Sequence, residues 1–267
     1  MRWSEPQQAM LREMGLRLWL PGAGQTDATA AAQHATRGDV PAAIPRMPAI
    51  GPADVATMGW PALREAVAGC QACGLCKSRR QTVFGVGHPR AHCMVVGEAP
   101  DEQEDARGEP FVGESGQLLD RMLRALGLSR ASAVSAVAGT DGMAAAGAMP
   151  AADPAHQVFI TNTLKCRPPR NRNPSADELA TCQPFLERQV ALVQPRVILA
   201  MGRFAVQSLL GSTEPIGQLR GRLHAWRGVP LVVTYHPAYL LRSLQDKAKA
   251  WEDLCLAASV AEQGGVS

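Results

Sequence analysis

The sequence predicts an α/β fold: a single three-layer α/β/α domain with a central, mostly parallel four-stranded sheet. Short apolar runs alternate along the chain with longer segments that carry apolar residues at helical spacing. The runs are hydrophobic throughout, which is typical of strands buried between two layers of helices. Among the 267 residues, 46% are hydrophobic and 19% are charged, so the chain can build a sizeable core and is not wholly disordered.

Four apolar runs are expected to be strands, and helices are expected between and after them. Gly127 is placed to end the first of these helices. Ser175, followed three residues later by Glu178, has the spacing of a capping box, which predicts the start of another helix. The expected strands are 93–96, 158–160, 196–201 and 231–234, and the expected helices are 118–126, 176–193, about 203–210 and a last one carrying Trp251.

Two low-complexity stretches lie outside this pattern. Residues 21–57 contain 11 Ala, 5 Pro and 4 Gly with no aromatic residue, and are expected to be a linker. With a short apolar helix over 10–20, this linker forms an expected N-terminal extension of residues 1–60. Residues 131–155 contain 11 Ala and are expected to be a surface loop inserted into the domain of residues 61–260.

Charge and hydropathy restrict the class of protein. The net charge of +3 is too slight to identify a polyanion-binding protein without knowing where the charges lie. The first twenty residues lack the continuous apolar stretch of a signal peptide, and no segment approaches the roughly 18 apolar residues of a membrane helix. We therefore expect a soluble protein of the bacterial cytoplasm, with no membrane partner. In that reducing compartment, an odd number of cysteines favours thiolate ligands over disulfides.

Five of the seven cysteines are grouped in a way that is typical of metal ligands. A CxxC alone is also compatible with a redox pair. Four thiolates together accept either zinc or a [4Fe–4S] cluster, so counting leaves both open. The other two, Cys93 and Cys255, lie in apolar runs and are expected to be buried. The grouped residues are Cys70, Cys73 and Cys76, then Cys166 and Cys182.

Polar residues follow the expected strands at the edge where such sheets bind ligands. In parallel α/β sheets the ligand lies at the carboxyl ends of the strands. Here those ends read GEAP, TN, MG and YHP. We therefore expect Glu98, Asn162 and His236 to converge.

Several motifs occur in an order and spacing that are specific only when taken together. They are CQAC, TVFGVG, VVGEAPDEQEDARGEPFVGESGQLLD, ITNTLKCRPPRNRNP, Cys182 and YHPAYLLR. On these residues the chain resembles the family-4 (iron–sulfur) uracil-DNA glycosylases over about residues 70–256. The resemblance implies a [4Fe–4S] cluster with a structural role, held by Cys70, Cys73, Cys166 and Cys182, and it leaves Cys76 without a place.

The resemblance also implies an activity. The protein is expected to act as a monomer on single- and double-stranded uracil-containing DNA, to flip the uracil out, and to hydrolyse its N-glycosidic bond. Phe111 is expected to stack on the base, Asn162 to read its N3–H and O4, and His236 to donate to O2 as the leaving group gains charge. Main-chain N–H groups are expected to complete the anion site at Gly97, Glu98 and Ala99.

Two carboxylates match the family pattern of the acidic loop. Either Glu98 or Glu104 is expected to polarise a water molecule or to stabilise the sugar cation, and Glu104 to exclude the methyl group of thymine. Asp101 stands where the family has a glycine, so the backbone turn at this residue is expected to differ from that of the family. Residues expected to contact DNA are Lys165, Arg167, Arg170 and Arg172 in a proline-stiffened loop, then Leu240 and Leu241 in the gap left by the flipped base, and Arg242 on a phosphate. One of the two leucines is expected to pack in the core instead.

Two other functions are alternatives to uracil excision. A relative that binds uracil-DNA covalently uses a histidine in an insertion after KCRPP, and the corresponding segment here, PRNRNPSADE, has none. A non-catalytic iron–sulfur module that only binds DNA would not depend on Asn162 or His236.

Overall fold

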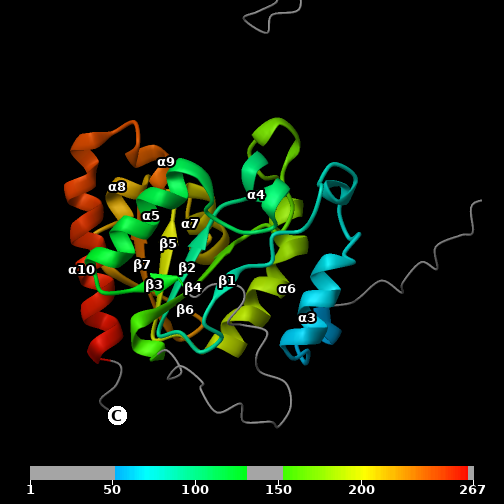
Figure 1. Ribbon diagram of the computed structural model, residues 1–267, viewed down its shortest axis with the longest axis horizontal. Helices are drawn as coiled ribbons and strands as arrows, with labels where there is room; N and C mark the ends of the chain where they lie inside the picture. Colours follow the sequence, from blue (N-terminus) through cyan, green and yellow to red (C-terminus); the bar gives the residue numbers. More distant parts are fainter. Residues whose placement is uncertain (1–51, 131–152, 264–267) are drawn as a thin grey trace, which may run out of the picture. The chain divides into compact units, whose positions relative to one another are not determined.

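The computed structural model describes residues 52–130 and 153–263 (Figure 1). The expected helix over 10–20, most of the expected linker and most of the Ala-rich insertion lie outside these described residues. The part of the insertion that is described ends in a short helix, η3 (Pro154–His156).

The four expected strands form the parallel centre of the sheet. They lie in the order β4-β2-β5-β7, and each neighbouring pair is parallel. All residues of the first three are buried, which explains why their sequences are apolar without alternation. Their bounds are β2 (Cys93–Gly97), β4 (Gln157–Asn162), β5 (Val197–Met201) and β7 (Val229–Thr234).

Three short edge strands enlarge this centre to a seven-stranded sheet, so the expected number of four was too low. β1 (Val86–Gly87) is antiparallel to β4, and β3 (Ser129–Arg130) is parallel to it. Strands of two residues leave no apolar run in the sequence. β6 (Leu223–Trp226) pairs antiparallel with β7 through a two-residue turn in which Arg227 and Gly228 both have positive φ.

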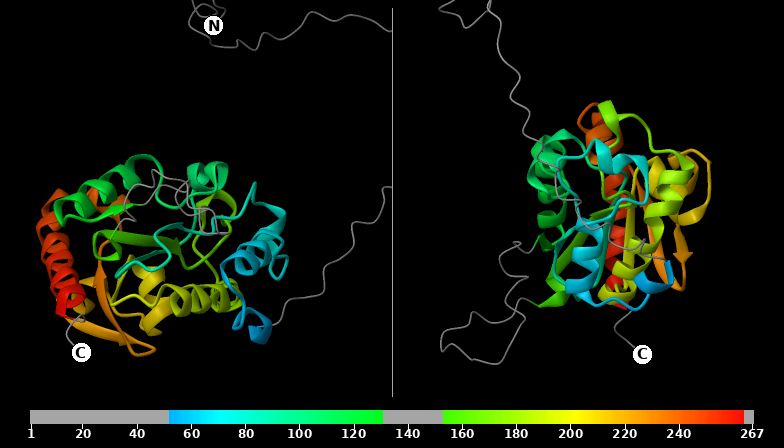
Figure 2. Two further views of the ribbon diagram at one scale, coloured as in Figure 1. Left: turned by 60° about the horizontal axis from the view of Figure 1, so that its bottom comes forward. Right: turned by 90° about the vertical axis from the view of Figure 1, so that its right-hand side faces the viewer.

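Helices cover both faces of the sheet, as the α/β/α prediction requires (Figure 2). α5 (Gly113–Ala125) and α10 (Lys247–Gln263) pack on one face. α3 (Trp60–Ala68), α6 (Ala176–Val193) and α7 (Arg203–Leu210) pack on the other. The remaining helices of the described part are α2 (Pro52–Val55), η1 (Gly74–Lys77), α4 (Glu102–Arg107), η4 (Pro169–Asn171), α8 (Ile216–Leu219), α9 (Pro237–Leu240) and η5 (Leu244–Asp246).

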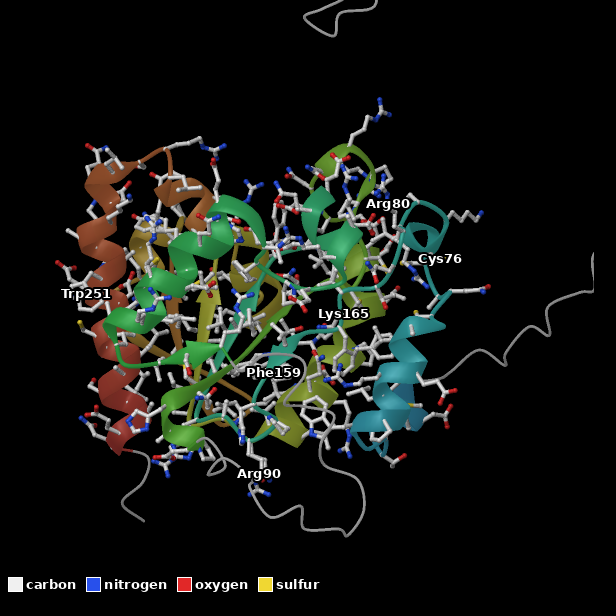
Figure 3. The ribbon with its side chains drawn as sticks, in the orientation of Figure 1. Cys76, Arg80, Arg90, Phe159, Lys165 and Trp251 are labelled. Carbon is white, nitrogen blue, oxygen red and sulfur yellow. The ribbon has the colours of Figure 1, made fainter. Side chains whose placement is uncertain are left out.

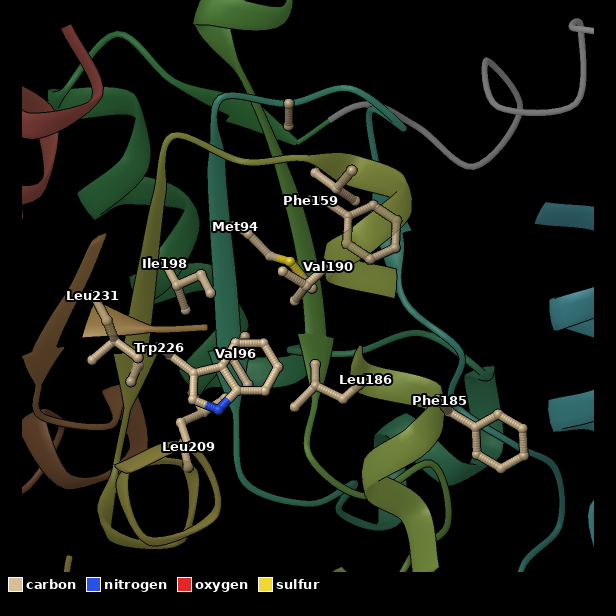
Figure 4. Packing of buried hydrophobic residues seen from close by; sticks show 14 of the residues in the cluster. Met94, Val96, Phe159, Phe185, Leu186, Val190, Ile198, Leu209, Trp226 and Leu231 are labelled. Atoms are coloured by element: carbon tan, nitrogen blue, oxygen red, sulfur yellow. The ribbon is translucent and has the colours of Figure 1, made fainter. Parts of the chain in front are cut away.

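Alternate residues of each strand enter different halves of the core. Met94 and Val96 of β2 point toward Leu186 and Val190 of α6, in the cluster shown in Figure 4. Their neighbour Val95 packs on the opposite face, against residues of α5 and α10. This alternation fixes which side chains of the strand ends can reach the site.

The sequence signals for helix ends are confirmed where they were clearest. Ser175 Oγ accepts from the Glu178 N–H at 3.2 Å, and Glu178 Oε2 accepts from the Ser175 N–H at 2.9 Å. α7 has the expected bounds, and α5 begins five residues earlier than expected because its first turn is polar.

Two expectations about the ends of the fold were wrong. The linker was expected to run to residue 57, but α2 begins at Pro52 and Val55 is buried in the core, with Met58 and Trp60 packed beside it. Cys93 is buried as expected, but Cys255 is exposed. It lies on the solvent side of α10 because Leu254 and Ala257 take the side that faces the sheet. No helix in the described ranges is long and apolar enough to cross a membrane.

Candidate active site and metal centre

Gly97 lets the ends of β2 and β4 bring two functional groups together. Gly97 and Asn162 are register partners at the carboxyl ends of these strands. A Cβ on Gly97 would lie 2.4 Å from Asn162 Oδ1 and 2.5 Å from Phe111 Cζ. Neither approach is possible with a side chain at residue 97, so the glycine is what allows the amide and the ring to meet over the strand.

Phe111 is held in a conformation that few residues adopt. Its φ of 53° lies in the left-handed region, which costs a non-glycine residue free energy and needs surrounding contacts to maintain it. Arg130 provides two of these contacts, from Nη1 to the Pro110 carbonyl at 2.8 Å and from Nη2 to the Phe111 carbonyl at 3.2 Å. A Cβ on Gly116 would lie only 1.7 Å from that same carbonyl oxygen.

The imidazole of His236 lies against the Phe111 ring. The rings are stacked with centroids 5.2 Å apart and an interplanar angle of 25°. This separation is typical of offset stacking, so the imidazole covers only part of the phenyl face. The Phe111 ring is itself buried, with 2% of the residue exposed, and belongs to the core cluster that packs against α5 and α10.

His236 is arranged as a neutral hydrogen-bond donor. Its Nδ1 accepts from the Ala238 N–H at 3.2 Å, which places the ring proton on Nε2. Burial lowers the pKa of His236 to about 4, against a smaller opposing effect of Asp101. At neutral pH the residue therefore has a donor at Nε2 and no charge.

Glu104 joins the two other members of the site. Its buried carboxylate accepts from the main-chain N–H of Phe111, from the Asp101 N–H at 3.1 Å, and from Asn162 Nδ2 at 3.2 Å. Burial raises the pKa of Glu104 to about 7. With three donors on it, the carboxylate orients the amide so that Nδ2 points to Glu104 and Oδ1 lies over Gly97. These contacts make it a positioning residue.

One oxygen of the Glu98 carboxylate is bonded outside this group of residues. Its Oε1 accepts from the Phe204 N–H at 3.0 Å, at the start of α7, and a Cβ on Gly202 would lie 2.4 Å from it. Burial raises the pKa of Glu98, and contacts with Phe204 and Arg203 oppose that effect. The expected convergence thus holds for Asn162 and His236, which meet through Phe111, while the Glu98 carboxylate caps a helix.

The backbone at Asp101 does not need the glycine that the family has at this position. Asp101 is the N-cap of α4, with Oδ1 accepting from the N–H groups of Gln103 at 2.8 Å and Glu104 at 2.9 Å. Its φ of −90° is ordinary for any residue. Because no left-handed turn occurs here, the position does not require glycine, and Asp stabilises the helix instead. α4 and α9 lie at the upper end of the sheet in Figure 1, beyond the strand ends.

The five grouped cysteines line one pocket. It lies between the end of α3, the η1 turn and the first turns of α6, and Leu75, Leu164 and Phe185 complete its walls. Within the described part of the chain, no group of three or more His, Cys, Asp or Glu side chains has an arrangement that could hold a metal ion. The thiols surround a hollow without converging on one point. They are Cys70, Cys73, Cys76, Cys166 and Cys182.

Two of these thiols accept hydrogen bonds. Cys166 Sγ accepts from Arg79 Nη1 at 3.0 Å, and Cys182 Sγ accepts from the Lys165 N–H at 3.3 Å. Burial raises the pKa of Cys182 to about 12 and also raises the pKa of Cys166. Without a metal these thiols are therefore protonated at neutral pH, and ligation would release their protons. Donors aimed at sulfur are typical of cluster-binding thiolates.

The structure corrects the expectation that Lys165 contacts DNA. Its side chain is 1% exposed, and its Nζ donates to Thr161 Oγ1 at 2.6 Å, to the Asn162 carbonyl at 2.7 Å and to Gln189 Oε1 at 2.7 Å. Burial lowers the pKa of Lys165 to about 8. The ammonium bonds the end of β4 from within the protein and is not available to a phosphate.

The other expected DNA contacts divide into paired and exposed residues. Arg167 bonds Glu102 at 3.3 Å, and Arg172 bonds Glu178 through both of its terminal nitrogens. Leu240 is 1% exposed and belongs to the interior, whereas Leu241 is 39% exposed. The remaining two, Arg170 and Arg242, are exposed and form no ion pair within the described ranges.

Three residues that organise the site were missed by the sequence analysis. Arg130 and Arg79 follow no pattern that distinguishes them from surface arginines. Gln189 had a signal, because it is a polar residue on the apolar side of α6, one turn after Leu186. Its Nε2 donates to the Phe84 carbonyl at 2.8 Å, and it is completely buried.

Comparison with known proteins identifies the family to which this chain belongs. The family model described as the uracil DNA glycosylase superfamily matches residues 84–255. A type-4 uracil-DNA glycosylase of Saccharolobus solfataricus is 39% identical over 181 residues, which are 64% of this chain and 72% of that protein. One of Pyrobaculum aerophilum is 35% identical over 202 residues, 73% of this chain and 90% of that protein. A type-5 uracil-DNA glycosylase of Thermus thermophilus is 33% identical over 166 residues, 58% of this chain and 68% of that protein. The chain therefore belongs to the uracil DNA glycosylase superfamily, among its type-4 uracil-DNA glycosylases.

Proposed function

We propose that the protein is a DNA repair enzyme that flips uracil out of DNA, hydrolyses its N-glycosidic bond and leaves an abasic site. The observation that carries this proposal is the meeting of Asn162, Phe111 and His236 at one edge of the sheet. A flipped base needs a stacking surface, a reader of its Watson–Crick edge and a donor to the leaving group. The three side chains match these needs one by one.

Asn162 is the proposed reader of the base. Its Oδ1 accepts from uracil N3–H, and the Nδ2 hydrogen that Glu104 does not hold donates to O4. Cytosine presents an acceptor at N3 and a donor at N4, so both contacts fail and leave buried polar groups unpaired. Such a mismatch discriminates by about 10²-fold or more. Glu104 contributes by preventing the amide from turning over.

His236 is the proposed catalytic residue for the leaving group. In the proposed pose the flipped base lies against the Phe111 ring with its O2 edge toward the imidazole, so that Nε2–H donates to O2. Negative charge develops on that oxygen as the C1′–N1 bond breaks, and a fixed donor stabilises it more than the ground state. The N–H groups at Gly97, Glu98 and Ala99 lie at the end of β2 and complete the anion site.

We assign the water molecule, or the developing sugar cation, to Glu98. Both oxygens of Glu104 already accept hydrogen bonds from within the protein, three in all, which makes Glu104 the weaker candidate for this role. Glu98 has one oxygen on the Phe204 N–H. An ionised carboxylate at the end of β2 stabilises positive charge on the sugar.

We propose that Cys70, Cys73, Cys166 and Cys182 hold a [4Fe–4S] cluster. The pocket supports this choice, because the thiols surround a hollow and two of them, Cys166 and Cys182, accept hydrogen bonds from N–H donors. A single zinc ion needs four sulfurs about 2.3 Å from one point, whereas a cluster takes one cysteine at each of its irons. When bound, the cluster supplies four iron–thiolate bonds that tie the start of the domain to the loop after β4. Hydrolysis requires no electron transfer, so we assign the cluster a structural role.

DNA is proposed to lie over the loops that follow β4 and β7, with the protein acting as a monomer. Arg170 and Arg242 are the exposed cations that fit phosphate contacts, and Leu241 is the exposed apolar side chain beside the site. The pairing of Arg167 and Arg172 with carboxylates makes them weaker candidates for phosphate contacts.

An excision assay on cluster-loaded protein tests the proposed function. We expect free uracil to be released from single- and double-stranded oligonucleotides, with strand breakage only after alkaline treatment, and no release of cytosine or thymine. Asn162→Ala is expected to lower kcat/KM by about 10²-fold, because the base loses both edge contacts. Uracil-DNA that stays intact after alkali, with iron present in the protein, would overturn the assignment. A denaturation-resistant adduct of protein and DNA would favour the covalent relative.

The exposure of Leu241 leads to a prediction about substrate strandedness. Leu241→Ala is expected to lower uracil excision from duplex DNA by roughly 10-fold and to change excision from single strands little. A wedge side chain offsets the cost of unstacking, which amounts to a few kcal/mol in duplex DNA and is small in a single strand. The ratio of the two rates measures this effect. Equal loss on both substrates would contradict a wedge role, and Leu244→Ala, at an even more exposed neighbour, is the matched control.

A further inference from the structure

Arg79 connects the two halves of the cysteine pocket. It follows the η1 turn, three residues after Cys76, and is partly buried. Nη1 donates to Cys166 Sγ at 3.0 Å, while Nη2 donates to the Cys70 carbonyl at 2.8 Å and to the Ala68 carbonyl at 3.1 Å. One guanidinium thus bonds a thiol of the loop after β4 and the backbone of a cysteine near the start of the domain.

Few charges surround this pocket. Besides Arg79, the buried ammonium of Lys165 interacts with both Cys182 and Cys166. A negative side chain, that of Glu178, acts on Cys73. Arg80 is adjacent in sequence, but its side chain is exposed and its main-chain N–H bonds the Asp105 carboxylate. Figure 3 labels Arg80, Cys76 and Lys165 in this region.

An assembled cluster is an anion, because four thiolates outweigh the positive charge of the iron–sulfide core. Each electron added to it increases the negative charge. Hydrogen bonds to the sulfurs and nearby cations therefore stabilise the more reduced state most, and they are among the factors that set cluster potentials. Since the Arg79 guanidinium is partly buried and directly bonded to sulfur, salt screens its effect little.

We propose that Arg79 stabilises the cluster by donating to Cys166 and raises its reduction potential. This inference rests on the proposed [4Fe–4S] cofactor. Because Nη1 and Nη2 of Arg79 bond different partners, the side chain has two effects. Its charge and its N–H bond to sulfur set the potential, while its simultaneous bonds to Cys166 and the Cys70 backbone retain the cluster against dissociation.

The test compares Arg79→Gln with Arg80→Gln, a neighbour that loses the same charge without touching a thiol. Each variant is assayed for iron per chain, for the midpoint of one-electron reduction followed by visible absorbance with dithionite as reductant, and for iron loss to a chelator. Arg79→Gln is expected to shift the one-electron equilibrium toward the oxidised state by at least about tenfold, which is 59 mV for one electron. Iron loss is expected to be about tenfold faster. Arg80→Gln is expected to match the wild type in both.

A second variant keeps the proposal testable if Arg79→Gln cannot retain iron. Arg79→Lys keeps the charge but cannot reach both partners, so we expect a potential near that of the wild type and faster iron loss. A potential and a rate of iron loss that are the same in Arg79→Gln and Arg80→Gln would overturn the proposal. Wild-type protein that takes up no iron on reconstitution, yet excises uracil, would overturn both this inference and the cofactor assignment, and would leave the glycosylase assignment intact.

Discussion

Replacing His236 with alanine is expected to lower kcat for uracil excision by about 10²–10³-fold, the usual effect of losing one donor to a developing oxyanion. The imidazole stacks on Phe111, and its Nε2–H is the side-chain donor assigned to O2 in the proposed pose. Binding of uracil-containing DNA is expected to change little, because the contact strengthens only as the bond breaks. Single-turnover rates with saturating protein, beside a separate binding measurement, distinguish the two effects.

The control for this prediction is His156→Ala, which removes an exposed histidine from η3, far along the chain from β7. It is expected to leave kcat unchanged. If the rate of His236→Ala stayed within a few-fold of the wild type, the leaving-group role would have to be given up. The alternative function, that of an iron–sulfur module that only binds DNA, would then gain support.

The same histidine sets an expectation for pH. Burial lowers the pKa of His236 to about 4, whereas an unfolded histidine takes up its proton near 6.5. The neutral imidazole thus persists when the pH falls below 6.5, so the His236 contribution to kcat is expected to stay constant until the ring is protonated near pH 4. Over the same window the unfolded chain binds more protons, so this residue's contribution to stability is complete above about 6.5 and declines as the pH falls to 4. Imidazole NMR titration measures the pKa directly.

Replacing Cys182 with serine is expected to abolish the cluster. The variant should contain little iron, show no brown colour and bind the metal centre more than about 100-fold more weakly, since it loses a ligand and not merely a neighbour of a ligand. Because binding energy at such sites is also folding energy, thermal unfolding should occur at a clearly lower temperature. Cys182 lies in the second turn of α6, so the loss also frees that helix from the loop after β4.

Two other cysteines provide matched controls for this result. Cys255 is exposed on α10, and Cys255→Ser should retain wild-type iron content. Cys76 lines the pocket but is outside the proposed ligand set, so Cys76→Ser should also retain the cluster. Loss of iron in Cys76→Ser with retention in Cys73→Ser would show that the ligand at this turn had been assigned to the wrong cysteine.

The sequence predicted best what depends on local pattern. The four central strands, the capping box at Ser175 and the bounds of α7 follow from periodicity and end signals, and the structure has them. The strand-end motifs also predicted that Asn162 and His236 would meet. What links them, Phe111 with its left-handed backbone, required three-dimensional constraints from Arg130 and Gly116 that no local pattern contains.

The errors at the site concern charged side chains, whose positions depend on tertiary partners. Lys165 stands in a run of cations that is typical of a solvated or DNA-binding surface, yet Thr161, Asn162 and Gln189 satisfy its ammonium in the interior. Glu98 and Glu104 are close in sequence, but one bonds α7 and the other holds the site together. A buried ion or carboxylate is favourable only where several partners converge, and composition does not report that convergence.

Gly97 limits how this enzyme can diverge. A methyl group at residue 97 would collide with both the Asn162 amide and the Phe111 ring, so even the smallest enlargement disrupts base reading and stacking together. Mutations at Asn162 or His236, by contrast, each alter one interaction and leave the other in place. Asn162 and His236 can therefore be changed one at a time, whereas we expect residue 97 to accept no side chain larger than that of glycine.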